Sequence, residues 1–214
     1  MLIFIADDKL PRDMLSEIYR VYKEAEVIFG TPSVCLELPV SLTLNRVTTI
    51  RETQYGKQKD AKKILSQVRK TLGTEGQSYV VITTCDITHE CASRESGYLN
   101  FVFGLRSGDD AVISAARLLE LPLEERKIVL GGVIMHEIGH IYGAAADPNR
   151  ANTEENLGTH CTDPYCVMQQ GATLGAMREN MLRVADAPKR FLTRRRPCFC
   201  KLCRKDIRLT LRHK

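Results

Sequence analysis

The chain has 214 residues, with 43% hydrophobic and 27% charged side chains and a formal net charge of +5, which is typical of one globular domain with a small appendage. This composition excludes disordered, fibrous and collagen-like proteins. No apolar run approaches the ~20 residues that cross a bilayer, and the apolar stretch at residues 2–6 is too short for a signal peptide, so we expect a cytoplasmic protein without membrane contact.

Hydrophobic patterning predicts a mixed sheet with helices, an α/β or α+β fold. Strands are expected at 2–6, 34–44, 79–84, 99–103 and 111–116, and helices at 10–29, from Asp60 to Leu72, and from Pro122 to about Tyr142. Residues 45–58 are expected to form a polar loop, and the turn-rich residues 104–110 to join the last two strands antiparallel at one sheet edge. Gly131 and Gly132 indicate close packing of the last helix against a neighbour.

The last helix carries the most informative motif, His136-Glu137-Ile-Gly-His140. Two histidines four residues apart point from one helix face and can hold one Zn²⁺. Glu137 can then take a proton from a zinc-bound water. Gly143 permits a sharp break that returns the chain toward the metal. The motif therefore predicts a zinc hydrolase.

Further residues extend this motif in the order His-Cys-x4-Cys-x-Met and, later, Cys-x-x-Cys: His160, Cys161, Cys166, Met168, Cys200 and Cys203. Together with the octet at 136–143, the pattern resembles the archaemetzincin family, which has HExxHxxGxxHC-x4-C-x-M followed by CxxC. The resemblance covers roughly residues 99–203. It implies a zincin-like, metzincin-like mixed sheet with an antiparallel edge strand and an active-site helix in residues 1–143, and a small zinc-stapled subdomain in residues 144–214.

The identity of the third catalytic-zinc ligand is open at this point, because two histidines do not complete such a site. The family position three residues after Gly143 is occupied by Ala146, and an insertion of fourteen residues, 146–159, precedes His160. His160 is the expected ligand because Cys161 follows it in the family register, and lengthening the loop costs only about 1 kcal/mol. Asp147 is the alternative, since carboxylates also bind zinc. A long polar loop here can also cover the cleft and suppress activity.

Two cysteine pairs, 161/166 and 200/203, predict a second, structural zinc, because four thiolates form a closed tetrahedral site. Eight cysteines in a reducing compartment also favour metal binding over disulfides. Cys198 is the alternative to Cys200, since Cys198-x4-Cys203 repeats the spacing of the first pair. The resemblance implies the same four-cysteine zinc, and Met168 in a turn beneath the imidazoles. We therefore expect two Zn²⁺ per chain.

These patterns predict a monomeric metzincin-type zinc metallopeptidase that acts on a peptide or protein substrate with Glu137 as general base. The edge strand near 111–116 is expected to pair with an extended peptide. The alternatives are a zinc-dependent amidase on small molecules and a non-catalytic, zinc-stabilised polyanion-binding protein. The last would use the basic segment 189–214, with eleven Lys and Arg against one acidic residue. Nucleic acid is the less favoured partner, because no aromatic interleaving accompanies this charge.

Overall fold

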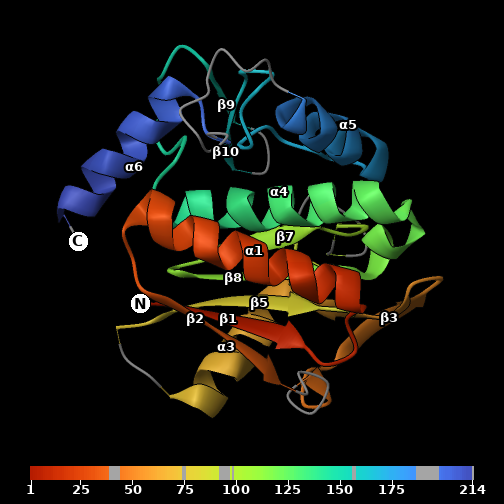
Figure 1. The fold of residues 1–214 in the computed structure, drawn as a ribbon. Helices are drawn as coiled ribbons and strands as arrows, with labels where there is room; N and C mark the ends of the chain where they lie inside the picture. The colour runs from red at the N-terminus through yellow and green to blue at the C-terminus, as the bar shows by residue number, and fades with distance from the viewer. Residues whose placement is uncertain are drawn as a thin grey trace.

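The structure is a computed structural model that describes residues 1–38, 44–73, 76–91, 97, 99–155, 158–186 and 198–213. Its centre is a five-stranded sheet in the order β2-β1-β5-β8-β7, in which the first four strands are parallel and β7 runs antiparallel to β8 (Figure 1). The strands are β1 (Leu2–Asp7), β2 (Ser33–Leu38), β5 (Ser78–Thr83), β7 (Gly104–Ser107) and β8 (Asp110–Ser114). The mixed sheet with an antiparallel edge, predicted from the sequence, is confirmed.

Helices cover both faces of this sheet. Helices α1 (Arg12–Phe29) and α4 (Leu123–Ile141) lie on one face, and α3 (Ala61–Leu72) lies on the other (Figure 1). Successive strand residues point to opposite faces, so β1 gives Phe4 to the cluster under α1 and α4 and Ile5 to the cluster under α3. The predicted start of α3 is also confirmed, because Asp60 caps it by accepting a hydrogen bond from the backbone of Lys63.

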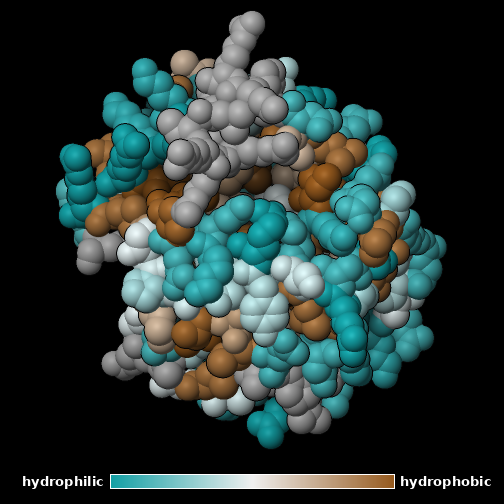
Figure 2. All heavy atoms as spheres, viewed as in Figure 1, coloured by the Kyte–Doolittle hydropathy of each residue, from teal (hydrophilic) through white to brown (hydrophobic). Residues whose placement is uncertain are grey.

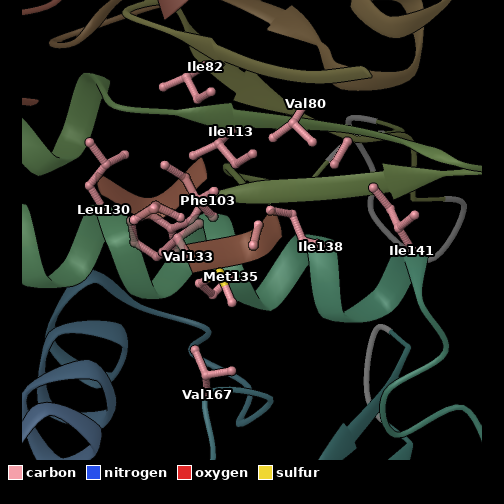
Figure 3. Packing of buried hydrophobic residues seen from close by; sticks show 14 of the residues in the cluster. Val80, Ile82, Phe103, Ile113, Leu130, Val133, Met135, Ile138, Ile141 and Val167 are labelled. Carbon is pink, nitrogen blue, oxygen red and sulfur yellow. The ribbon is translucent and has the colours of Figure 1, made fainter. Parts of the chain in front are cut away.

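From Val129 to Ile141, helix α4 is buried on nearly all sides, which explains why this part of its sequence lacks a polar face. Figure 3 shows Leu130, Val133 and Ile138 on the side that faces Val80, Ile82 and Ile113 of the sheet, and Val167 beyond the opposite side of the helix. The two helix glycines mark close contacts as predicted. A Cβ at Gly131 would collide with Glu17 of α1, and one at Gly132 would lie 2.8 Å from Cγ of Met181, in the later helix α5 (Leu174–Ala185).

The chain after α4 packs on the side of that helix that faces away from the sheet (Figure 1). It forms the hairpin β9 (Thr153–Glu155) and β10 (Thr159–Cys161), then α5 (Leu174–Ala185) and α6 (Lys201–His213). The buried residues Val167, Met168 and Phe199 belong to the same core cluster as α4. The break after α4 is present, since Gly143 has a φ of +75° and donates a hydrogen bond to the carbonyl of His140.

The prediction of a polar loop at 45–58 is wrong in part. It contains β3 (Thr49–Thr53) and β4 (Gly56–Asp60), which form a small sheet with β6 (Asp86–Thr88). The side chains of these strands are polar, and hydrogen bonds between these side chains hold the strands together. Arg51 Nε donates to Gln58 Oε1 at 2.6 Å, and Gln58 Nε2 donates to Asp86 Oδ2 at 2.9 Å. Hydrophobic alternation is therefore weak in this segment, and it gave no strand signal.

The strand predicted at 99–103 is also wrong. The carbonyl of Leu99 accepts from Arg51 at 2.6 Å and from Thr88 at 2.5 Å, and that of Asn100 accepts from Arg51 and from Gln58, each at 2.8 Å. Side-chain donors therefore occupy both lone pairs of each carbonyl, so neither is available for a strand ladder. The edge strand is instead β7, inside the stretch predicted to be the turn. The turn itself is narrower, at Gly108 and Asp109. The predicted strand 34–44 ends at Leu38 as β2, and residues 39–43 lie outside the described residues.

A short 3-10 helix, η1 (Ala116–Glu120), connects β8 to α4. None of the helices that the structure describes is long and apolar enough to span a bilayer. Hydrophilic residues cover much of the face seen in Figure 2, where exposed apolar side chains lie in separate groups.

Candidate metal centres

Helix α4 places His136 and His140 side by side in its last two turns. Their Nε2 atoms are 3.1 Å apart, and the ring centroids are 4.7 Å apart with the planes at 79°. In a tetrahedral zinc site with Zn–N bonds of about 2.0–2.1 Å, two ligand nitrogens lie about 3.3–3.4 Å apart. The spacing of the two nitrogens therefore suits one zinc ion held between them.

His160 joins these two histidines from the hairpin that follows the inserted loop. Its ring centroid lies 5.2 Å from each of the other two, and one ligand atom from each of the three histidines falls within 4.8 Å of the others. The hairpin explains how a long insertion can deliver this side chain, because β10 pairs with β9 in a register that sets His160 opposite Glu154. The structure therefore brings together the three histidines that the sequence analysis selected.

Backbone carbonyls orient two of the three rings. His136 Nδ1 donates to Val167 O at 2.8 Å, and His160 Nδ1 donates to Gly158 O at 2.9 Å. A carbonyl only accepts, so each Nδ1 carries the hydrogen, and each Nε2 is then the nitrogen that can offer its lone pair to a metal. Neither Val167 nor Gly158 gave a signal in the sequence, because a backbone contact depends on the fold and not on the residue type.

Burial keeps the imidazoles of His136 and His140 neutral. It lowers the pKa of His136 to about 4, with a smaller contribution from His160 in the same direction, and the hydrogen bond to Val167 opposes it only in part. Burial likewise lowers the pKa of His140 well below its usual value, with His136 and His160 adding to the effect. Neutral histidine is the form that binds zinc, so the donor set fits this metal near neutral pH.

Glu137 lies beside the histidines and is buried against the edge strand. A Cβ at Gly104 of β7 would lie 2.6 Å from Glu137 Cγ and 2.7 Å from Cδ, so only glycine lets the strand approach this closely. Burial raises the pKa of Glu137 to about 8, and the nearby charge of Arg106 opposes the shift. Arg106 also donates to the carbonyl of His140 at 3.0 Å. Sequence reasoning missed Gly104 and Arg106, because the strand that carries them was expected to be a turn.

Met168 lies directly against α4 and has no exposed surface. A Cβ at Gly139 would lie 2.5 Å from Met168 Sδ and 2.7 Å from Cε1 of Phe199, so the helix glycine makes room for both side chains. The backbone carbonyl of Met168 accepts from the Cys161 N–H at 2.9 Å. The methionine thus packs against α4 at Gly139, next to His140 in the sequence, and its backbone carbonyl connects it to β10.

Asp147, the alternative ligand, lies in an exposed turn at the start of the insertion. Its Oδ1 accepts from the backbone N–H of Asn149 at 2.9 Å, and its carbonyl accepts from Arg150 N at 3.3 Å. Within the described part of the chain, the metal-competent groups include His160 and do not include Asp147. The geometry therefore favours His160.

Four thiols form a second group near the start of α6. Cys161 Sγ and Cys200 Sγ are 3.8 Å apart, and Cys166 Sγ and Cys203 Sγ are 3.6 Å apart. Sulfur atoms in a tetrahedral site with Zn–S bonds of about 2.3 Å lie about 3.8 Å apart, so the four thiols fit zinc. Their Sγ atoms all lie within 4.8 Å of one another.

Cys198, the alternative to Cys200, is not in this group as far as the described residues go. Its carbonyl accepts from Val167 N at 2.7 Å, and burial raises the pKa of its thiol to about 12. Cys198 therefore sits in the core as a neutral thiol. The carbonyl of Cys198 thus fixes the position of Val167, whose own carbonyl orients His136.

The two candidate centres share one short strand. Neighbouring residues on a β-strand point to opposite faces, so His160 faces the histidine group and Cys161 faces the thiol group. A displacement of β10 would therefore change both groups together.

No protein-family model matches the chain, and no curated protein does. Two solved structures match it over nearly its full length. The archaemetzincin from Methanopyrus kandleri has a TM-score of 0.63 and 23% identity, with 99% of this chain and 94% of that chain covered. The archaemetzincin from Archaeoglobus fulgidus, complexed with malonate, has a TM-score of 0.59 and 20% identity, with 96% of this chain and 99% of that chain covered. The chain therefore has the archaemetzincin fold, as its combined motif predicted.

Proposed function

We propose that the chain is a zinc-dependent metallopeptidase whose catalytic metal is held by His136, His140 and His160. The observation that carries this proposal is the meeting of three histidines, two of them buried, with one buried carboxylate, that of Glu137. The archaemetzincin fold supports it independently. A second zinc in the four-cysteine group would have a structural role, because a closed thiolate site leaves no position for water.

Zinc bound at the histidines would lower the pKa of a ligated water to about 7 and polarise the carbonyl to be cleaved. Glu137 accepts the proton of the attacking water and delivers it to the departing amine. In the metal-free site, burial raises the pKa of Glu137 to about 8. A nearby dication lowers such a pKa, which leaves the carboxylate ionised and ready to accept a proton.

The edge strand favours an extended peptide as the substrate. That edge was predicted at 111–116, but β8 lies between β5 and β7, so β7 is the edge strand at this end of the sheet. This strand runs beside α4, with Gly104 against Glu137 and Arg106 against the end of the helix. A peptide added to β7 as a further antiparallel or parallel strand would pass next to the histidine group.

The test is a search for new termini in a peptide library after incubation with zinc-loaded protein. We expect wild type to produce them, and Glu137→Gln to retain its zinc and produce none. Glu124→Gln is the matched control, because it makes the same change in the exposed first turn of the same helix. Turnover retained by Glu137→Gln would remove Glu137 as the base. A zinc-loaded wild type that cleaves acylated small amines but no peptide would replace the peptidase with an amidase.

A further inference from the structure

The inserted segment 146–159 sends two side chains to the four-cysteine group. Asn152 Nδ2 lies 3.4 Å from Cys161 Sγ and 4.0 Å from Cys200 Sγ, in donating position. Arg150 Nη2 donates to Cys203 Sγ at 3.3 Å. Both groups are donors without acceptor character at the contacting atom, so they suit thiolates better than thiols.

The guanidinium of Arg150 also forms an ion pair with Asp206 of α6, and the two side chains are only 10% and 17% exposed. Asp206 accepts in addition from the backbone N–H of Ala145 at 3.2 Å. Arg150 therefore connects a cysteine of the group, the helix that carries this cysteine, and the chain just after α4.

The backbone of the insertion holds both side chains in place. Thr153 Oγ1 and the Thr153 N–H donate to the carbonyl of Arg150 at 2.7 and 3.0 Å, and Thr162 N donates to the carbonyl of Asn152 at 2.9 Å. Two of their own polar atoms, Arg150 Nε and Asn152 Oδ1, are buried without a hydrogen-bond partner among the described residues. Such burial is unfavourable unless other contacts offset it, and these two side chains have their contacts with sulfur together with the ion pair between Arg150 and Asp206.

The negative charge of a four-thiolate zinc site explains why these contacts are favourable. Four thiolates around one Zn²⁺ carry a net charge of −2, which a half-buried site must neutralise. Backbone donors contribute, since Cys200 N donates to Cys166 Sγ at 3.3 Å and Cys203 N approaches Cys200 Sγ at 3.5 Å. Arg150 adds the one full positive charge that contacts a sulfur of this group within the part of the chain described.

We propose that Arg150 and Asn152 are positioning residues of the four-cysteine zinc site, and that the insertion retains this metal by donating hydrogen bonds to its thiolates. This inference rests on the proposed zinc at the cysteines. It assigns a role to the insertion other than covering the catalytic cleft. Residues that orient metal ligands in this way typically change metal affinity by about 10–100-fold when they are replaced.

The test compares two changes of the same kind in the full-length protein. Asn152→Asp replaces a donor with a carboxylate that repels thiolates, and Asn149→Asp puts the same charge at an exposed position of the same insertion. Zinc release to a chromogenic chelator is followed in each. We expect release from Asn152→Asp to be about 10–100-fold faster and release from Asn149→Asp to match wild type. Equal rates in the two variants would overturn the proposal.

Cobalt substitution supplies a readout that a merely structural role would not move. The thiolate-to-cobalt charge-transfer band arises from the cysteine site alone, and a thiolate that loses a hydrogen bond gives up an electron more readily. We expect this band to shift to longer wavelength in Asn152→Asp and Arg150→Met, with Arg150→Lys in between. An unshifted band in all three would also overturn the proposal, and Asn152→Asp keeps the test decisive where Arg150→Met fails to fold.

The outcome separates this inference from the proposed catalytic function. A wild-type protein without any charge-transfer band would overturn the inference, because the cysteines then hold no metal. The peptidase proposal would stand or fall independently, on cleavage by wild type and its loss in Glu137→Gln.

Discussion

The contact between Gly104 and Glu137 allows a sharp test of how the carboxylate is positioned. In Gly104→Ala the new methyl group would lie 2.6 Å from Glu137 Cγ and 2.7 Å from Cδ, with Oε1 closer still, whereas ordinary contacts begin at 3.4 Å. Because two carbon atoms are affected besides the oxygen, rotation of the carboxylate alone cannot relieve the overlap. The side chain must move by about 1 Å, since α4 is enclosed by the core.

A misplacement of about 1 Å in a catalytic group costs about 10²-fold in rate, equivalent to about 2.7 kcal/mol. We therefore expect Gly104→Ala to lower kcat/KM for a cleaved peptide by about that factor. Zinc content should stay at the wild-type value, because the methyl group points at Glu137 and not at a histidine. Overpacking should also lower the free energy of unfolding by about 1–3 kcal/mol.

The assay combines peptide hydrolysis, elemental analysis and denaturant unfolding. Gly175→Ala is the matched control, because a Cβ there meets nothing closer than 4.0 Å and Gly175 lies in α5, on the far side of α4 from β7. A Gly104→Ala protein with wild-type kcat/KM would refute the reasoning. It would mean that β7 moves aside and that Glu137 does not depend on this strand for its position.

Three further outcomes are expected. His160→Ala should lose one of two zinc ions per chain by elemental analysis, whereas Asp147→Ala should keep both, and the opposite pattern would make the aspartate the ligand. Cys203→Ala should lower zinc occupancy at the histidines as well as stability, because β10 serves both groups, and full occupancy there would contradict this link. The bidentate bond from Arg126 lowers the pKa of Asp13, so this pair stabilises the fold by about 1 kcal/mol above pH ~4 and less as the pH falls further. Unfolding of Arg126→Met across pH 2–7 should show the difference from wild type shrinking only at the acid end.

Much of the candidate site could be predicted because its residues lie close together in the sequence, at spacings typical of metal ligands. On a helix, the spacing from His136 to His140 places both side chains on one face. The apolar residues around them predict the end of that helix to within one residue. The cysteine pairs are equally local. His160 was harder, since a fourteen-residue insertion hides the family spacing, and only the adjacent Cys161 marked it.

The parts that could not be predicted depend on contacts between distant segments. Strands β3 and β4 are held by polar side chains, above all by Arg51, which bonds both to Gln58 and to carbonyls at 99 and 100. That one side chain connects the strands that were not expected with the segment where a strand was expected. The sheet edge was predicted at the residues of β8, whereas the edge strand is β7. Gly104 of β7, which contacts Glu137, was therefore missed.

The hairpin β9–β10 shows why the insertion is compatible with a metal site. A flexible loop of about 20 residues would cost about 1 kcal/mol more to close than one of about 6 residues, and it would leave His160 free to move. Here the insertion makes its own hydrogen bonds, pairs Thr159–Cys161 with Thr153–Glu155, and places Arg150 and Asn152 on the thiols. Cys161 lies on the opposite face of β10 in the thiol group, so the cysteine group and the carbonyl of Gly158 both contribute to the position of His160. The insertion, the histidine group and the thiol group are therefore connected through β10.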